Sequence, residues 1–231
     1  MHSYLARFPK LYAILSSLRK TPNYEKILYL QTVKKGAVVI DAGANRGYFT
    51  TLFSMLVGNT GEVHAFEPVP ETYDLLLANT GGRASNVKAN HLAVGRTRGM
   101  APISYDLDDS EKASLAHAST TNARSCKVGV IPLDEYVNEE NIRRLDFVKI
   151  DVEGYELQAL AGMEKSLGDF TPQLSIEVTL PHQERSALFS FLKQVGYESF
   201  RVIEKGYPAY NSSRHSSDDY FYLHAFSSKT A

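Results

Sequence analysis

Residues 38–50 read VVIDAGANRGYFT, and this stretch decides how the chain is interpreted. A continuous apolar run ends in Asp41, and Gly43 and Gly47 then frame a turn into an apolar helix predicted at 48–57. Gly43 can adopt a positive φ and lets backbone approach a ligand closely, while Gly47 permits tight packing between helix and strand. The unpaired N–H groups and positive dipole end of the helix favour an anionic or carboxylate ligand at this turn.

The spacing of the turn separates two classes of ligand. Dinucleotide-binding folds use G-x-G-x-x-G, whereas this chain has D-x-G-x-N-x-G, with Asn45 in place of the middle glycine. S-adenosylmethionine has no pyrophosphate that must pass close to that residue, and it carries an amino acid tail instead. Asp41 suits the ammonium of the tail, directly or through water, and the backbone around Gly43 and Asn45 suits the rest. A purely structural turn is the alternative.

Further apolar runs follow this first one at regular intervals. They are continuous rather than alternating, as expected of strands buried on both faces of a parallel sheet. The runs are AVVIDAG (37–43), EVHAFEP (62–68), VKANHLAVG (87–95), DFVKIDVEG (146–154) and QLSIEV (173–178). Helical patterns are predicted between them at 48–57, 71–79, 155–167 and 183–195. This rhythm predicts an α/β doubly wound sheet, and the runs at 199–206 and 218–226 predict a hairpin-like antiparallel end.

The composition indicates one large globular domain with little overall charge. The chain has 231 residues, 43% hydrophobic and 22% charged, and a net charge of -1, so no global field favours nucleic acid. The single cysteine, Cys126, excludes an internal disulfide. No apolar run is long enough to cross a bilayer and no convincing signal peptide is present, so we expect a cytoplasmic protein.

We divide the chain into a helical extension at 1–35 and a catalytic domain at 36–231. The extension has seven basic residues against one acid, Glu25, with apolar residues at helical spacing. It packs on the domain or lies on an anionic membrane surface. Residues 100–130 break the rhythm of the sheet, and we expect a strand pair or a mobile excursion there. Such segments are often lids or substrate-binding elements, with a plain surface insertion as the alternative.

A second candidate for ligand binding follows the next strand. Glu67 stands at the strand end, 20 residues after Gly47 (67 − 47). An acid there accepts hydrogen bonds from both hydroxyls of a ribose, and Pro68 then turns the chain sharply. Ala93 is expected at the end of the third strand, where an adenine ring would rest. The alternative for Glu67 is a surface carboxylate.

Charged residues also gather at the end of the fourth strand. Alternation sends Lys149, Asp151 and Glu153 toward one side, and the carboxyl ends of strands in an open α/β sheet face the ligand crevice. Buried charges are costly unless they are satisfied, which makes this group a candidate for function. The alternative is a salt bridge from Lys149 to one of the acids that only fixes the turn.

The fifth strand adds Glu177 at the same edge, and His182 follows it. His182 is a candidate general base because the pKa of a histidine lies near 6.5, although it also fits a structural role. The histidines and cysteine show no strict metal-ligand spacing, so we expect no metal site. A divalent ion held by Asp151 with Glu153 or Glu177 is the alternative.

The chain resembles the FkbM family of methyltransferases in several of these stretches. They are VVIDAGANRGYFT, VHAFEPVPETYDLL, LDEYV, DFVKIDVEGYELQALAGM and LSIEV, with K-x-D-x-E-G at 149–154 the most specific. The resemblance implies a Rossmann-like, seven-stranded class I methyltransferase that uses S-adenosylmethionine. It implies that Asp41, Gly43, Asn45, Gly47 and Glu67 line the cofactor site, with Lys149, Asp151 and Glu153 beside it. It also implies transfer mainly to oxygen, often to hydroxyls of sugars or polyketide-type products.

We therefore predict direct transfer of a methyl group from the sulfonium to a hydroxyl of a small molecule. Positioning is the main contribution, because the sulfonium is already a good leaving group, and Asp151 or His182 serves as base. Tyr155 is expected to shape the acceptor pocket. Three alternatives are kept: an NAD-dependent oxidoreductase, a nucleic-acid methyltransferase, and a non-catalytic nucleotide-binding or scaffold protein.

Overall fold

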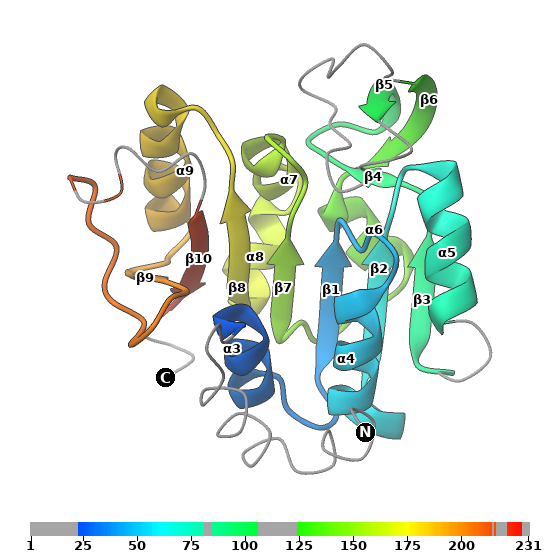
Figure 1. The fold of residues 1–231 in the computed structure, drawn as a ribbon, viewed down its shortest axis with the longest axis horizontal. Coiled ribbons are helices and arrows are strands. Elements are labelled where there is room, and N and C mark those ends of the chain that lie inside the picture. The colour runs from blue at the N-terminus through cyan, green and yellow to red at the C-terminus, as the bar shows by residue number, and fades with distance from the viewer. Residues whose placement is uncertain (1–22, 81–84, 106–123, 214, 216–220, 228–231) are drawn as a thin grey trace.

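The structure is a computed structural model that describes residues 23–80, 85–105, 124–213, 215 and 221–227, without the side chains of residues 182, 183 and 221. Its centre is a seven-stranded sheet in the order β3-β2-β1-β7-β8-β10-β9 (Figure 1). The strands are β1 (Val38–Ala42), β2 (Glu62–Phe66), β3 (Val87–Asn90), β7 (Phe147–Ile150), β8 (Gln173–Val178), β9 (Ser199–Val202) and β10 (Phe221–Phe226). The predicted doubly wound sheet is confirmed.

The register of the sheet brings the sequence motifs to one edge. Strand β1 is parallel to both β2 and β7, and Asp41 pairs with Ala65 on one side and Lys149 on the other. Strand β10 is antiparallel to β8 and to β9, between which it lies. The predicted antiparallel end is therefore present. The motif residues lie at the ends of parallel strands or directly after them, so they meet at the carboxyl edge of the sheet.

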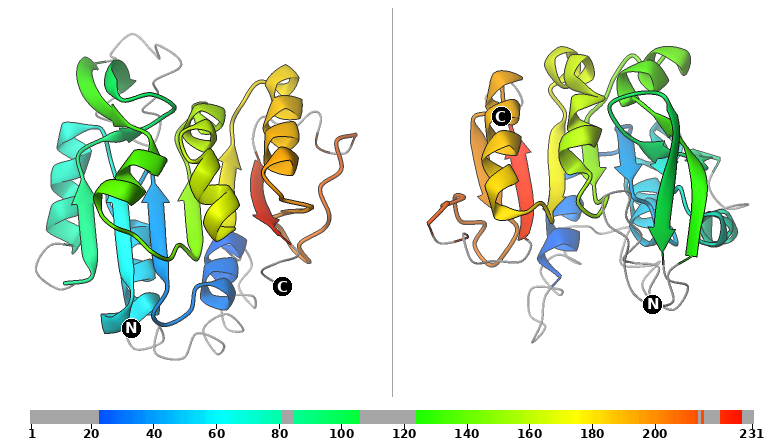
Figure 2. Two further views of the ribbon diagram at one scale, coloured as in Figure 1. Left: turned by 180° about the vertical axis from the view of Figure 1, so that it is seen from behind. Right: turned by 90° about the horizontal axis from the view of Figure 1, so that it is seen from above.

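Helices cover both faces of the sheet (Figures 1 and 2). One face carries α3 (Tyr24–Thr32), α4 (Tyr48–Val57), the 3-10 turn η1 (Gly58–Thr60) and α5 (Pro70–Thr80). The other carries α6 (Leu133–Glu139), α7 (Glu156–Ala161), α8 (Glu164–Phe170) and α9 (His182–Gln194). Each face has its own apolar core. In the core on the face that carries α3 and α4, the fully buried Tyr29 of α3 packs against Phe49, Phe53 and Phe147. This part of the extension therefore belongs to the domain core.

A second, three-stranded sheet stands above the carboxyl edge, at the upper right of Figure 1. Its strands are β4 (Ala93–Val94), β5 (Gly99–Tyr105) and β6 (Arg124–Ile131), in the order β4-β6-β5. The strand pair expected within 100–130 is therefore present, and residues 106–123 lie outside the described part. The third strand is corrected: β3 ends at Asn90, and Ala93 belongs to β4, because it pairs with Val130 of β6.

Two helix predictions are also corrected. The single helix expected at 155–167 is two short helices, α7 and α8, separated at Gly162. A Cβ on Gly162 would lie 2.0 Å from the carbonyl oxygen of Gly95, so the backbone passes too close to this neighbour for any other residue. No helix was predicted where α6 lies, because its seven residues are too few to show a clear helical periodicity.

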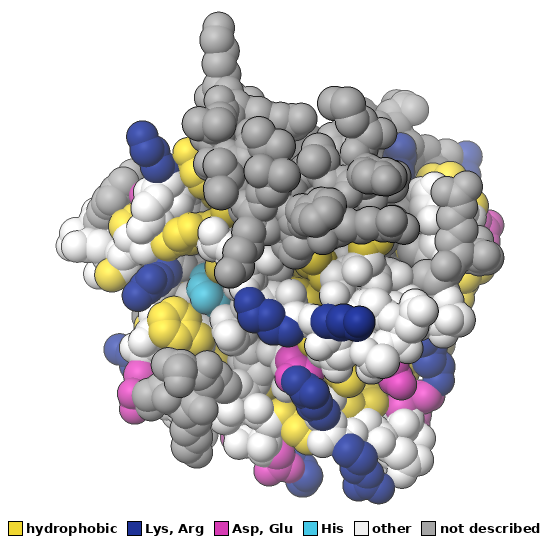
Figure 3. All heavy atoms as spheres, turned by 90° about the horizontal axis from the view of Figure 1, so that it is seen from below, with side chains coloured by type: hydrophobic (Ala, Val, Ile, Leu, Met, Phe, Trp, Pro, Cys, Tyr) yellow, Lys and Arg dark blue, Asp and Glu magenta, His cyan; other side chains and the backbone are white. Residues whose placement is uncertain are grey.

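The face opposite the carboxyl edge carries scattered charges of both signs. In Figure 3 its Lys and Arg side chains stand apart from one another, with Asp and Glu side chains between them. Exposed basic residues there include Lys34 and Lys35 before β1, and Arg144, which is paired with Asp146 before β7. The described residues thus give no support to the predicted membrane contact, and residues 1–22 lie outside them. Within the described residues, every helix is too short or too polar to span a bilayer.

Candidate active site

A cavity of about 470 Å³ opens at the carboxyl edge of β1, β2, β7 and β8. Nine of the eleven residues predicted for cofactor binding or as catalytic candidates line it, and so does Glu177; the nine are Asp41, Gly43, Asn45, Glu67, Pro68, Ala93, Lys149, Asp151 and Glu153. The strand-end argument therefore brings together groups from three separate motifs.

The first loop leaves β1 in a conformation that only glycine accepts at Gly43. Its φ is +79°, and a Cβ there would lie 1.7 Å from the carbonyl oxygen of Asp151. The loop is held by the N–H groups of Gly43 and Ala44, which both donate to the Phe66 carbonyl at 3.0 and 2.9 Å. The loops after β1, β2 and β7 are thus packed backbone against backbone beneath the cavity.

Glu67 is buried and fixed by the two loops beside it. One carboxylate oxygen accepts from the N–H of Asn45 and the other from the N–H of Val69, each at 2.9 Å. Burial raises the pKa of Glu67 to about 7 in spite of these two hydrogen bonds, which favour the charged form. Each oxygen keeps a further lone pair, so the carboxylate can still accept two hydroxyls from the cavity.

Asp41 is fully buried and only half satisfied. Its Oδ2 accepts from the Thr50 hydroxyl at 2.6 Å, while its Oδ1 has no hydrogen-bond partner among the described residues. Burial raises the pKa of Asp41, and the Lys149 ammonium opposes the rise. Because buried polar atoms almost always have partners, from protein, ligand or ordered water, the bare oxygen can accept a hydrogen bond from a donor in the cavity.

Lys149 is the buried cation at the centre of the site. Its Nζ lies 2.6 Å from Asp151 Oδ2 and 5.4 Å from the centroid of the Phe49 ring. Burial by itself would lower the pKa of Lys149, but Asp151, Asp41 and Glu25 outweigh it and raise the pKa above its usual value. Lys149 therefore keeps its proton at neutral pH, which suits a positioning role better than that of a base.

Glu25 of α3 reaches the same cavity from the N-terminal extension. It accepts from the Tyr29 hydroxyl, which also lies 2.9 Å from the Ser175 hydroxyl of β8. Burial raises the pKa of Glu25 and Lys149 lowers it. The sequence analysis missed this residue, although its position as the only acid in a basic stretch was the available indication.

Three carboxylates stand together on the β7–β8 side of the cavity. Asp151, Glu153 and Glu177 each place an oxygen within 4.8 Å of the other two. Oxygen ligands in such a group would suit a divalent cation, but such groups are common without one, and Lys149 already supplies a positive charge to Asp151. We assign no metal to this group.

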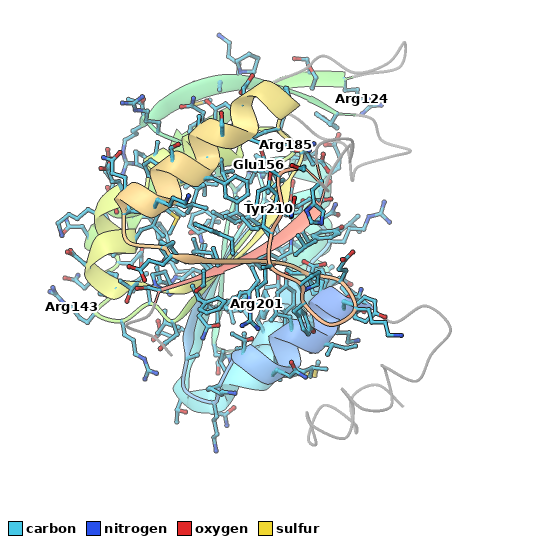
Figure 4. The ribbon with its side chains drawn as sticks, turned by 90° about the vertical axis from the view of Figure 1, so that its left-hand side faces the viewer. Arg124, Arg143, Glu156, Arg185, Arg201 and Tyr210 are labelled. Atoms are coloured by element: carbon cyan, nitrogen blue, oxygen red, sulfur yellow. The ribbon has the colours of Figure 1, made fainter. Side chains whose placement is uncertain are left out.

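Glu156 ties the two turns that carry these carboxylates. It is fully buried on α7, and its Oε1 accepts from the Gly154 N–H at 3.0 Å and the Thr179 hydroxyl at 2.5 Å. Figure 4 shows Glu156 among the interior side chains beside α9. Gly154 follows Glu153, and Thr179 follows β8, so the Glu156 side chain fixes the spacing between the turns that follow β7 and β8.

The other end of the cavity is apolar. Its lining there comes from Phe66 at the end of β2, from Leu92 just before β4, and from Ala93, Val94 and Ile103 of the second sheet. Ile103 lies on β5, so the segment predicted as an excursion contributes directly to the cavity. One end of the cavity thus suits charged groups and the other a flat apolar ring.

Gly47 and Tyr155, which were predicted for the site, are not among the residues that line the cavity, and the side chain of His182 is not described. Gly47 is the N-cap of α4 with φ +83°, and a Cβ there would meet Leu76 Cδ1 of α5 at 2.8 Å, so its role is to let two helices pack closely. The backbone of His182 begins α9, but its side chain lies outside the described part of the structure. Its proposed role as base stays a prediction.

The family described as "Methyltransferase FkbM domain" matches residues 41–199, which is more than half of the chain. The chain belongs to the FkbM methyltransferase family. The predicted methyltransferase, and the family resemblance drawn from the motifs, are confirmed.

Relatives of this family act on different molecules. The methyltransferase sdnD of Sordaria araneosa is 28% identical, over 71% of this chain and 74% of its own length. The hexuronic acid methyltransferase AglP of Haloferax volcanii is 30% identical, over 61% of this chain and 55% of its own length. The 31-O-demethyl-FK506 methyltransferase FkbM of Streptomyces tacrolimicus is 25% identical, over 77% and 78%.

Solved structures agree with the fold. A methyltransferase FkbM from Methylobacillus flagellatus KT has a TM-score of 0.57 at 14% identity, and covers 97% of this chain and 60% of its own. The Aeropyrum pernix fibrillarin with natively bound S-adenosyl-L-methionine has a TM-score of 0.51 at 14% identity, and covers 96% and 76%. The predicted Rossmann-like class I methyltransferase fold is confirmed.

Proposed function

We propose that this chain transfers a methyl group from S-adenosylmethionine to a hydroxyl oxygen of a small molecule of the sugar or natural-product type. The observation that carries the donor is the charge of the cavity. Among the described residues, six carboxyl groups line it, from Glu25, Asp41, Glu67, Asp151, Glu153 and Glu177, against two cations, Arg46 and Lys149. S-adenosylmethionine has a sulfonium and an ammonium against one carboxylate, so its net positive charge matches this excess.

The same residues suggest how the donor is held. Glu67 accepts hydrogen bonds from the ribose hydroxyls with its remaining lone pairs, and Pro68 turns the chain beside it. The bare Oδ1 of Asp41 accepts from the ammonium, directly or through water. The backbone from Gly43 to Asn45 lies against the rest of the amino acid tail. The adenine ring rests at the apolar end, against Ala93 and Ile103.

The acceptor side is assigned to the β7–β8 wall. Lys149 holds Asp151 in place, and Asp151 and Glu153 face the space that remains for the acceptor. His182, at the start of α9, stays a candidate for the base. The names of AglP and of the Streptomyces tacrolimicus enzyme support an oxygen acceptor on a sugar or natural product. The donor supplies an electrophilic methyl group, and the chain positions the acceptor oxygen and excludes water from the cavity.

A thermal-shift comparison tests the donor. At 100 times its dissociation constant, adenosylhomocysteine should stabilise the protein by about 2.7 kcal/mol, which raises the melting temperature of a domain of this size by about 5–10 °C. NAD should give no shift, because its pyrophosphate would face the six carboxylates. A shift with NAD alone would favour the oxidoreductase, and no shift with either would favour the non-catalytic alternative.

The acceptor is tested with labelled donor. The protein is incubated with methyl-labelled S-adenosylmethionine and a panel of uronic acids, neutral sugars and polyketide alcohols, and the products are separated by mass. Label in an ether carbon bonded to a former hydroxyl supports the proposal. Label at nitrogen, or in an added RNA with strong dependence on salt, would replace it with another acceptor class.

A further inference from the structure

The proposed reaction needs a group that takes the proton of the acceptor hydroxyl. We propose that this group is Glu177, at the end of β8, acting as the general base beside its partner Asp151. The inference rests on the proposed function, since a base is needed only if a hydroxyl is the acceptor. Asp151, one of the two candidates from the sequence, does not have this combination of place and environment, and the side chain of His182, the other candidate, lies outside the described part of the structure.

The position of Glu177 follows from the sheet. Strand β8 is the parallel neighbour of β7, so Glu177 ends beside Asp151 at the carboxyl edge and lines the cavity. It is paired across the antiparallel strand with Tyr222 of β10, whose hydroxyl donates to it. The side chain is only half-buried. A carboxylate that is fixed from two sides and still open to the cavity can meet a substrate oxygen.

The charges around Glu177 separate it from Asp151. Burial raises the pKa of Asp151, but the charge of the adjacent Lys149 ammonium and the hydrogen bonds from Glu177 and Lys149 together outweigh it, and the net pKa lies below the usual value. For Glu177, burial and then the Asp151 carboxylate raise the pKa to about 9, Glu153 adds to the rise, and Lys149 opposes it. Two neighbouring carboxylates cannot both ionise freely. The proton of the pair therefore rests on Glu177, and Asp151 keeps the ion pair.

This assignment gives a balanced step. The acceptor oxygen forms a bond to the methyl carbon, the carbon–sulfur bond breaks with its electron pair on sulfur, and the hydroxyl proton passes to the Glu177 carboxylate. The resulting carboxylic acid then gives its proton to water. Glu177 must be ionised before the step, and a cationic ligand in the cavity favours that ionised form. Donor binding should therefore release a proton from Glu177.

Calorimetry measures that release without any turnover. S-adenosylmethionine is titrated at pH 8 into the full-length protein in two buffers of different ionisation enthalpy. At this pH Glu67 is already largely ionised, since its pKa is about 7, whereas Glu177 is largely protonated. We expect the wild type to release most of one proton more per donor bound than Glu177→Gln does, since the donor's own amino group, which also titrates near pH 8, contributes equally to both. Glu71→Gln, which changes an exposed carboxylate outside the cavity lining, should keep the release.

Kinetics give the second readout. Glu177→Gln should lower kcat by about 100-fold or more. It should also weaken donor binding by about fivefold or more, because the variant lacks the ionised carboxylate that the donor favours. Glu177→Asp keeps a carboxylate, so it should restore part of kcat and keep the proton release, and it serves if the glutamine variant does not fold. Adenosylhomocysteine, which lacks the sulfonium charge, should release fewer protons than the donor.

Three results would overturn the assignment. The proposal falls if Glu177→Gln releases as many protons as the wild type, or if its kcat stays within threefold of the wild type. It also falls if a chelator abolishes activity, added Mg²⁺ restores it, and Glu177→Gln removes that dependence, because Glu177 would then be a cation ligand. A wild type that binds no donor at all would instead refute the proposed function.

Discussion

Replacing Gly43 with alanine should separate the loops that form the floor of the cavity. At φ +79° an alanine costs about 1–2 kcal/mol from backbone strain alone. Its Cβ would also stand 1.7 Å from the Asp151 carbonyl oxygen, half the shortest ordinary separation of 3.4 Å. That neighbour is backbone, fixed by the Asp151 N–H bond to the Ala42 carbonyl at 3.0 Å, and cannot rotate away. Overpacking of this kind adds about 1–3 kcal/mol or more.

Two other glycines provide matched controls for this variant. Gly206 has nearly the same φ, +80°, and nothing within 4 Å of its Cβ position, so Gly206→Ala measures the backbone strain alone. Gly47 has φ +83°, but its Cβ would meet the flexible ends of Leu76 and Thr80. The loss of stability should therefore increase from Gly206→Ala through Gly47→Ala to Gly43→Ala, from about 1–2 to about 2–5 kcal/mol.

Urea unfolding followed by circular dichroism gives the three free energies, and calorimetry with adenosylhomocysteine gives the affinity. Gly43→Ala should also weaken binding, because the loop that carries Asn45 and holds Glu67 must move. The reasoning is refuted if Gly43→Ala is no less stable than Gly206→Ala, or if it binds the ligand as tightly as the wild type.

Other outcomes follow from the same contacts. Glu67→Gln should weaken adenosylhomocysteine binding by about 10- to 100-fold, because it loses a charged hydrogen bond worth about 1.5–3 kcal/mol. Glu71 is exposed, so Glu71→Gln should leave the affinity measured by calorimetry unchanged. The pKa of Glu67 is raised on folding from 4.5 to about 7, so the native state binds the extra proton in that range and stability falls as pH rises through it. Relative to Glu67→Gln, the wild type should lose about 3 kcal/mol in urea unfolding between pH 4.5 and 8; a constant difference would contradict the raised pKa. Glu156→Ala leaves the Gly154 N–H and the Thr179 hydroxyl without their acceptor, so the free energy of unfolding should fall by about 2–4 kcal/mol. Thr179→Ser keeps the hydroxyl and should lower it far less. Lys149→Met leaves buried carboxylates without their cation and should cost about 3–5 kcal/mol at neutral pH; a stability equal to that of the wild type would show that the ion pair is dispensable.

The sequence predicted most of the residues that line the cavity because the cavity lies at strand ends. Asp41, Glu67 and Asp151 each follow a short apolar run that local composition identifies as a strand, and parallel strands bring their carboxyl ends to one edge. The same reasoning identified Gly43, because the need for a positive φ at a turn depends only on the local backbone. It assigned Ala93 to the wrong strand, because two residues of β4 cannot be told from the end of β3 without the partner strand β6.

The sequence could not show which acidic side chains neutralise the charge of Lys149. Lys149 pairs with Asp151, two residues away on the chain, but its surroundings also include Glu25 from α3, more than a hundred residues earlier. The difference in basicity between Asp151 and Glu177 depends on this arrangement. Burial and charge at a given atom are sums over all neighbours in space, and local spacing reports only those along the chain.

The sequence alone thus determined the α/β class, the carboxyl edge as the location of the site, and most of the groups that line it. Those features depend on periodicity and on backbone freedom, which act over a few residues. Only the tertiary structure decided that α3 closes the cavity with Glu25, that β5 supplies Ile103, and that Tyr222 stands against Glu177. These contacts join elements far apart in the chain, and their geometry is set by how helices and sheets pack.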